Sequence, residues 1–138
     1  EHGPAGGDEI NMVKFNNFSF QKNNYGWPLA SYGAHYGDEL PISNSHIENG
    51  FIEPLKYFVP SIGISEITKV GKKTYVAASM ANKALWFFKL DSKNKISELK
   101  RISIKERIRD IKFKGKKLFL FLEDSASIGI IPMNILPI

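Results

Sequence analysis

The sequence contains no cysteine among its 138 residues. This excludes a disulfide framework, a cysteine-based zinc site and a thiol nucleophile. It also lacks any run of the roughly 20 consecutive apolar residues that a membrane-spanning helix needs. No segment shows an apolar helical stripe with capping residues at both ends. We therefore expect a soluble chain built from strands, with no thiol chemistry in its function.

What the chain does contain is typical of one folded domain, since 43% of its residues are hydrophobic. Its first residue is Glu1 rather than methionine, and glycine, proline and aspartate crowd the first eight positions. We expect this start to be a cut or processed end. Any signal peptide would then lie outside the sequence.

The formal net charge of +5 raises the question of a nucleic-acid partner. The lysines gather at three short segments, residues 71–73, 91–95 and 114–117, each between two apolar runs. Lysine at a hairpin turn is solvated, and no interleaved aromatic residues accompany these lysines as a stacking platform. We expect no nucleic-acid partner.

A regular series of short β-type runs begins near Gly63. Segments with turn chemistry separate the runs, as expected for a sandwich or a propeller. The predicted strands are Ile64–Val70, Thr74–Ser79, Ala84–Leu90, Ile96–Ile102, Ile108–Phe113, Leu118–Leu122 and Ser127–Met133.

The number of strands favours a propeller. Four strands make a complete blade in residues 62–103, and only three follow in residues 104–138. In a closed propeller the last blade commonly takes its missing strand from the distant N-terminus. The sequence therefore predicts an all-β chain that forms the C-terminal part of a propeller, about two blades plus long loops.

Residues 1–61 are rich in loops and contain one strand-like run, Glu9–Phe15. Long ordered loops in a compact protein are commonly functional surfaces. We expect the candidate site to draw on this segment.

Several motifs carry a family resemblance that covers nearly the whole chain in order. They are Glu1–Asn11 (EHGPAGGDEIN), Tyr25–Pro28 (YGWP), Ala30–Gly33 (ASYG), Glu53–Pro54, Pro60–Ser65 (PSIGIS) and Arg107–Asp110 (RIRD). Together they resemble the soluble glucose/aldose (sorbosone) dehydrogenases that depend on pyrroloquinoline quinone (PQQ). The resemblance implies a six-bladed β-propeller that binds PQQ and Ca²⁺ and oxidises an aldose C1 hydroxyl to a lactone.

The resemblance assigns roles to the first residues. The carbonyl groups of Gly3 and Pro4 would bind the calcium ion that holds the quinone, and calcium accepts neutral carbonyl oxygens readily. A simple Gly-Pro turn is the alternative reading. His2 would contact the cofactor or substrate, whereas the family's base histidine lies earlier in the chain, outside this sequence.

A second, structural calcium site is implied at Asp8 and Glu9, with the backbone of Tyr25 as a further ligand. Paired acids followed by tyrosine are also common on any surface. We interpret His35 and His46 as ordinary loop histidines, because no carboxylate pattern supports a metal site between them.

Arg107 and Arg109 alternate along one predicted strand, so both should point to the same face. In the resembling family these arginines face the PQQ carboxylates, where guanidinium groups pair well with carboxylate. The alternative is a pair of surface arginines. The family's cofactor lysine corresponds to Ala81 here, and Lys83 could reach the same volume.

Two aromatic pairs, Tyr25 with Trp27 and Tyr57 with Phe58, could stack on a sugar or could pack between blades. The resemblance further implies a periplasmic or secreted location, a small sugar substrate and an electron acceptor that the sequence does not identify. We expect this segment to be inactive alone. The alternatives are a noncatalytic propeller that binds a carbohydrate or a protein, and a small free-standing β domain.

Overall fold

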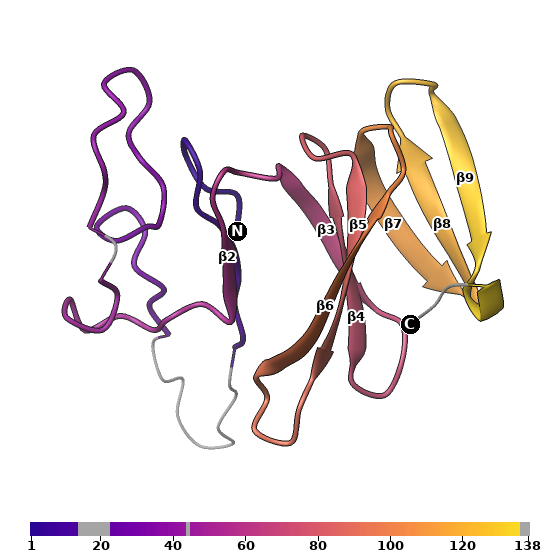
Figure 1. The fold of residues 1–138 in the computed structure, drawn as a ribbon, viewed down its shortest axis with the longest axis horizontal. Coiled ribbons are helices and arrows are strands. Elements are labelled where there is room, and N and C mark those ends of the chain that lie inside the picture. The colour runs from indigo at the N-terminus through magenta and orange to yellow at the C-terminus, as the bar shows by residue number, and fades with distance from the viewer. Residues whose placement is uncertain (14–22, 44, 136–138) are drawn as a thin grey trace. The chain divides into compact units, whose positions relative to one another are not determined.

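The computed structural model describes residues 1–13, 23–43 and 45–135 (Figure 1). The chain divides into two compact units, Glu1–Ser61 and Ile62–Ile138, and each is described by itself. Within the described residues, no helix has the length and apolar character required to cross a membrane.

The first unit is built mostly from loops around one short antiparallel pair of strands. Strand β1 (Asp8–Ile10) pairs with β2 (Lys56–Phe58), so segments far apart in sequence lie side by side. The expected strand Glu9–Phe15 is therefore wrong in its bounds: the strand begins one residue earlier and ends at Ile10. Residues 14 and 15 lie outside the described part of the chain.

Asp8 connects the first loop to the end of this unit. Its side chain is fully buried, and its Oδ1 accepts hydrogen bonds from the backbone N–H of Gly3 (2.9 Å) and the hydroxyl of Ser61 (2.5 Å). A buried carboxylate requires such donors because it has lost its hydration. Asp8 thus organises this loop, and its predicted place at a calcium site stays a prediction.

The second unit contains two antiparallel sheets. The first has the order β3-β4-β5-β6 and the second the order β7-β8-β9. Both sheets are visible in Figure 1 as successive hairpins. The strands are β3 (Ile64–Lys69), β4 (Thr74–Ser79), β5 (Ala84–Leu90), β6 (Ile96–Ser103), β7 (Ile108–Lys114), β8 (Lys117–Leu122) and β9 (Ser127–Pro132).

The core of this unit draws on both sheets. Val76 and Leu85 come from the first sheet, and Ile108 and Leu118 come from the second; all four are fully buried in one apolar cluster. Removing apolar surface from water stabilises a fold by about 25 cal/mol per Å². The two sheets therefore stabilise each other, and a hydrogen bond from the Ser65 hydroxyl to the Ile108 carbonyl (2.7 Å) joins them.

The all-β prediction is confirmed, and the seven predicted strands of this unit are all present. A four-stranded sheet followed by a three-stranded one is the predicted arrangement of blades. The last strand is shorter than predicted, because Met133 begins a 3₁₀ turn, Met133–Ile135.

Candidate functional site

A cavity of about 130 Å³ in the first unit gathers most of the residues predicted near calcium. His2, Gly3, Glu9 and Tyr25 all line it, together with residues that include Glu1. A volume of this size exceeds what one water molecule requires. The structure therefore brings together four residues that the sequence resemblance placed at two neighbouring sites.

The loop that carries Gly3 is wound too tightly to admit a side chain at that position. A Cβ atom on Gly3 would lie 2.2 Å from the Gly6 carbonyl oxygen and 2.5 Å from the Gly7 carbonyl oxygen. Only glycine fits here, because the Gly6 and Gly7 carbonyl groups pack against its Cα. Binding of calcium by the Gly3 carbonyl group stays a prediction. Pro4 is not among the residues that line the cavity.

Glu9 supplies a buried negative charge to the cavity. Its side chain is almost fully buried, and burial raises the pKa of its carboxyl group, although Asn11 and His46 partly oppose that rise. The Asn11 amide donates to Glu9 Oε2 (3.2 Å) and also to the carboxylate of Glu1. The carboxylates of Glu9 and Glu1 thus share one amide donor, and paired carboxylates are a donor set that a hard cation such as calcium accepts.

Three or more His, Cys, Asp or Glu side chains do not gather as a metal-binding group anywhere in the described residues. A cation in the cavity would therefore depend on the carboxylate of Glu9, that of Glu1 and backbone oxygens. The Tyr25 hydroxyl donates to the Met12 carbonyl (2.9 Å), which leaves the backbone of Tyr25 as the ligand that the sequence predicts.

The aromatic pairs have different surroundings. Trp27 is 58% exposed and lines the same cavity as Tyr25, so its ring is open to a ligand. Phe58 is 6% exposed, which favours packing over sugar stacking. Tyr57 stacks on Tyr32, with ring centroids 3.7 Å apart.

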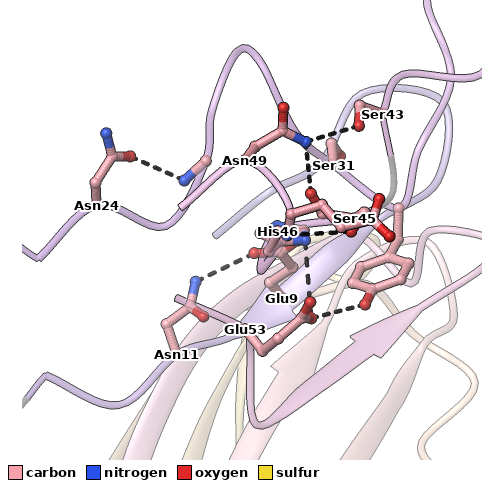
Figure 2. A network of polar contacts seen from close by, with 12 residues as sticks. Glu9, Asn11, Asn24, Ser31, Ser43, Ser45, His46, Asn49 and Glu53 are labelled. Atoms are coloured by element: carbon pink, nitrogen blue, oxygen red, sulfur yellow. Dashed lines mark hydrogen bonds and ion pairs between the residues drawn. The ribbon is translucent and has the colours of Figure 1, made fainter. Parts of the chain in front are cut away.

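His46 is not an ordinary loop histidine, and that interpretation of the sequence is wrong. Its side chain is fully buried, and Figure 2 shows it between two carboxylates. Its Nε2 lies 3.4 Å from Glu9 Oε1, and its Nδ1 lies 3.8 Å from Glu53 Oε2. No sequence pattern indicates this burial, because burial in an irregular loop follows no periodicity.

Tyr32 completes the surroundings of His46. The two rings stack with centroids 5.1 Å apart, and the Tyr32 hydroxyl donates to Glu53 Oε2 (2.7 Å). Burial first, and then the hydrogen bond to Glu53, raise the pKa of Tyr32 to about 12. The phenol therefore stays a neutral donor to the carboxylate at all ordinary pH values.

The second unit brings together the three basic residues predicted to bind the cofactor. Lys83, Arg107 and Arg109 all contact the turn that follows β8, which begins with Glu123 and Asp124. Lys83 Nζ lies 2.7 Å from Asp124 Oδ2. Arg107 Nε lies 3.3 Å from Glu123 Oε1, and Arg109 Nη2 lies 2.5 Å from Glu123 Oε2.

Both arginines contact the same carboxylate, one oxygen each, but the prediction that they alternate along one strand is wrong. Arg107 precedes β7, and the register of that strand shifts between Ile108 and Asp110. The two side chains therefore do not reach Glu123 through simple alternation along one regular strand. The sequence did not predict the counter-charge that Glu123 supplies, because a glutamate in a turn shows no pattern that reveals its partners.

Lys83 and Ala81 lie in the turn between β4 and β5. Ala81 is exposed, and its backbone packs against Gly63, where a Cβ atom would lie 2.8 Å from the Ala81 nitrogen. Lys83 instead extends to Asp124, and this hydrogen bond is the main cause that holds the pKa of Asp124 below its ordinary value. The Lys83 ammonium thus lies beside the arginines, where a cofactor role stays a prediction.

Several known proteins are similar to this chain in sequence. The family model described as glucose/sorbosone dehydrogenase matches residues 1–131. The aldose sugar dehydrogenase YliI of Escherichia coli is 41% identical over 66 residues, which are 47% of this chain and 16% of that protein.

Solved structures are similar over more of the chain. The crystal structure of a glucose dehydrogenase has a TM-score of 0.71 and 32% identity, over 87% of this chain and 36% of that one. The apo form of the soluble aldose sugar dehydrogenase from Escherichia coli has a TM-score of 0.76 and 26% identity, over 96% of this chain and 40% of that one. The chain thus spans well under half of these relatives.

Proposed function

Because this chain belongs to the glucose/sorbosone dehydrogenase family, we propose that the whole protein oxidises the C1 hydroxyl of an aldose to a lactone, using PQQ and Ca²⁺. The observation that carries this proposal is the cavity that gathers His2, Gly3, Glu9 and Tyr25. The sequence resemblance associated these four residues with cofactor or calcium.

The reaction breaks the C1–H and O–H bonds of the sugar and forms a C1=O bond. When bound, PQQ would supply the oxidising power, as the acceptor of the two electrons and two protons that the sugar loses. The residues of this chain would bind and orient the reactants.

The residues of this chain have distinct tasks in the proposal. The carbonyl groups of Gly3 and Pro4 hold the calcium ion at the cofactor, and Glu9 with the Tyr25 backbone holds a structural cation. His2 lies beside the cofactor. Each of these groups binds or orients calcium or the cofactor, and none of them is proposed to exchange a proton with the sugar.

Lys83, Arg107 and Arg109 provide the positive charge that an anionic cofactor requires. The Arg109 side chain is 59% exposed, and a guanidinium has five N–H donors in a fixed planar arrangement. The contact with Glu123 therefore leaves donors of Arg109 for the carboxylates of PQQ. Lys83 compensates for Ala81 in the position where the family has lysine.

Two parts of the proposal concern the whole protein. The general base would come from a region outside this chain, so the segment alone would be inactive. We also propose a periplasmic or secreted location, where PQQ and calcium are available together.

The test uses the full-length protein, stripped of metal and then titrated with Ca²⁺ and PQQ. We expect saturable PQQ binding that requires calcium, followed by reduction of a dye when an aldose is added. Arg107→Ala and Arg109→Ala should each weaken PQQ binding. Lys72→Ala, in an exposed turn, is the matched control for loss of one positive charge.

The outcomes separate the alternatives. Absence of PQQ binding at saturating calcium would overturn the proposal. Cofactor-independent sugar binding without dye reduction with any aldose would instead support a noncatalytic propeller.

A further inference from the structure

His46 lies beside Glu9, which lines the cavity. It is fully buried, and neither ring nitrogen makes a hydrogen bond to another described residue. The closest acidic groups are Glu9 Oε1 at 3.4 Å and Glu53 Oε2 at 3.8 Å. Buried polar nitrogens are costly when unpaired, so a histidine maintained here needs a reason beyond packing.

The imidazole also contacts the loop that carries the other cavity residues. A Cβ atom on Gly26 would lie 3.0 Å from His46 Cδ2, and Gly26 has a φ of 102°. Gly26 lies between Tyr25 and Trp27, which both line the cavity. One side chain therefore limits the position of the Glu9 carboxylate and of the Tyr25–Trp27 loop.

The rest of the environment holds the imidazole in place. Its ring stacks on Tyr32, which donates to Glu53 and stacks in turn on Tyr57. The His46 carbonyl accepts hydrogen bonds from the N–H groups of Phe51 (2.8 Å) and Asn49 (3.2 Å). Figure 2 shows Glu9, His46 and Glu53 converging from separate segments of the chain.

We propose that His46 is a positioning residue, whose Nε2 orients the Glu9 carboxylate toward the cavity and so determines the affinity of that cavity for a divalent cation. This role rests on the proposed cation site. Groups that orient a metal ligand without touching the metal commonly change metal affinity by about 10- to 100-fold.

The test compares three substitutions of His46 in the full-length protein. His46→Phe keeps an aromatic ring for stacking on Tyr32 and removes both nitrogens. His46→Gln places an amide N–H near the position of Nε2, whereas His46→Asn places one near Nδ1. His35→Gln, at an exposed loop histidine, is the matched control.

Each variant is stripped of metal with a chelator and loaded with Tb³⁺, whose luminescence Tyr25 and Trp27 can sensitise because both line the cavity. Ca²⁺ is then titrated in, and the loss of luminescence gives its affinity. Glu9→Gln identifies the part of the signal that belongs to this site. We expect His46→Phe and His46→Asn to weaken binding about tenfold or more. His46→Gln should stay within about threefold of the wild type, a smaller loss than removal of the orienting group gives.

The melting temperature without metal separates positioning from folding. A purely structural His46 would lower this temperature in every variant while the folded protein kept its cation affinity, and that result would overturn the role. Equal affinity in the Gln and Asn variants would do the same. If Glu9→Gln binds calcium as the wild type does, the proposed cation site itself is wrong.

Discussion

The ammonium nitrogen of Lys83 lies 2.7 Å from a carboxylate oxygen of Asp124, although 41 positions separate the two residues in sequence. The contact joins the turn between β4 and β5 to the turn between β8 and β9. Asp124 also accepts the backbone N–H of Arg107 (3.3 Å). A single surface carboxylate thus connects two of the three basic residues that we propose to face the cofactor.

Asp124 should make stability depend on pH in the acid range. Its pKa is lowered in the folded protein, chiefly by the hydrogen bond from Lys83. Its contribution is therefore present above the unfolded pKa, near 3.8, and is lost as the pH falls through the lower folded value. Asp124→Asn should be less stable than the wild type at neutral pH in urea unfolding, and this difference should disappear in acid. A difference that persists at the lowest pH would contradict the assignment.

Glu123→Gln should destabilise the protein modestly, because it removes the shared counter-charge of Arg107 and Arg109. Exposed ion pairs contribute about 0.2–1 kcal/mol each, and salt screens them. We expect a loss of about 1 kcal/mol in urea unfolding at low salt, shrinking at high salt. Glu98→Gln, which breaks one exposed pair with Lys89, should change stability less. Equal losses in both variants would show that sharing one carboxylate adds nothing.

Leu85→Ala should destabilise the core between the two sheets. Leu85 is fully buried, and removal of a buried leucine side chain costs about 2–5 kcal/mol through lost burial and the cavity that remains. The measurement is the free energy of unfolding in urea. Leu99→Ala on β6, where the side chain is 39% exposed, is the control and should cost much less. A comparable loss in both would mean that the core is misplaced.

Tyr32→Phe should test the hydrogen bond to Glu53 without disturbing the ring stack on Tyr57. A hydrogen bond to a charged group contributes about 1.5–3 kcal/mol, so we expect a destabilisation of about 1.5 kcal/mol. Tyr36→Phe removes a hydroxyl from a ring that is 76% exposed, and its melting temperature should match the wild type. An unchanged melting temperature for Tyr32→Phe would show that water replaces the phenol at Glu53.

The strands of the second unit were predictable because each is bounded by turn residues and carries side chains suited to a packed sheet. The segments Thr74–Ser79 and Ala84–Leu90 match β4 and β5 at both ends. Strand β2 was missed, because three residues close to Pro54 and Pro60 show no period-2 pattern. Its partner β1 is remote in sequence, and local reasoning cannot detect such pairing.

Residues of the candidate site could be named from the sequence where a motif marks them. They could not be named where their importance depends on burial or on a partner that is distant in sequence. The family resemblance gave Gly3 as a candidate, and the structure shows why no larger residue fits there. His46 and Glu123 were not identified, since each matters through a partner brought near by the fold. Histidine in a loop and glutamate in a turn have no sequence pattern that reveals such partners.

The close approach of Gly26 to His46 has an evolutionary consequence. A methyl group at position 26 would meet His46 Cδ2 at 3.0 Å and the Ala30 side chain at 3.0 Å, while a φ of 102° disfavours any side chain. The two positions are therefore not free to vary independently. Among related sequences, we expect a residue other than glycine at position 26 only where a smaller residue replaces His46 and the loop has been rebuilt.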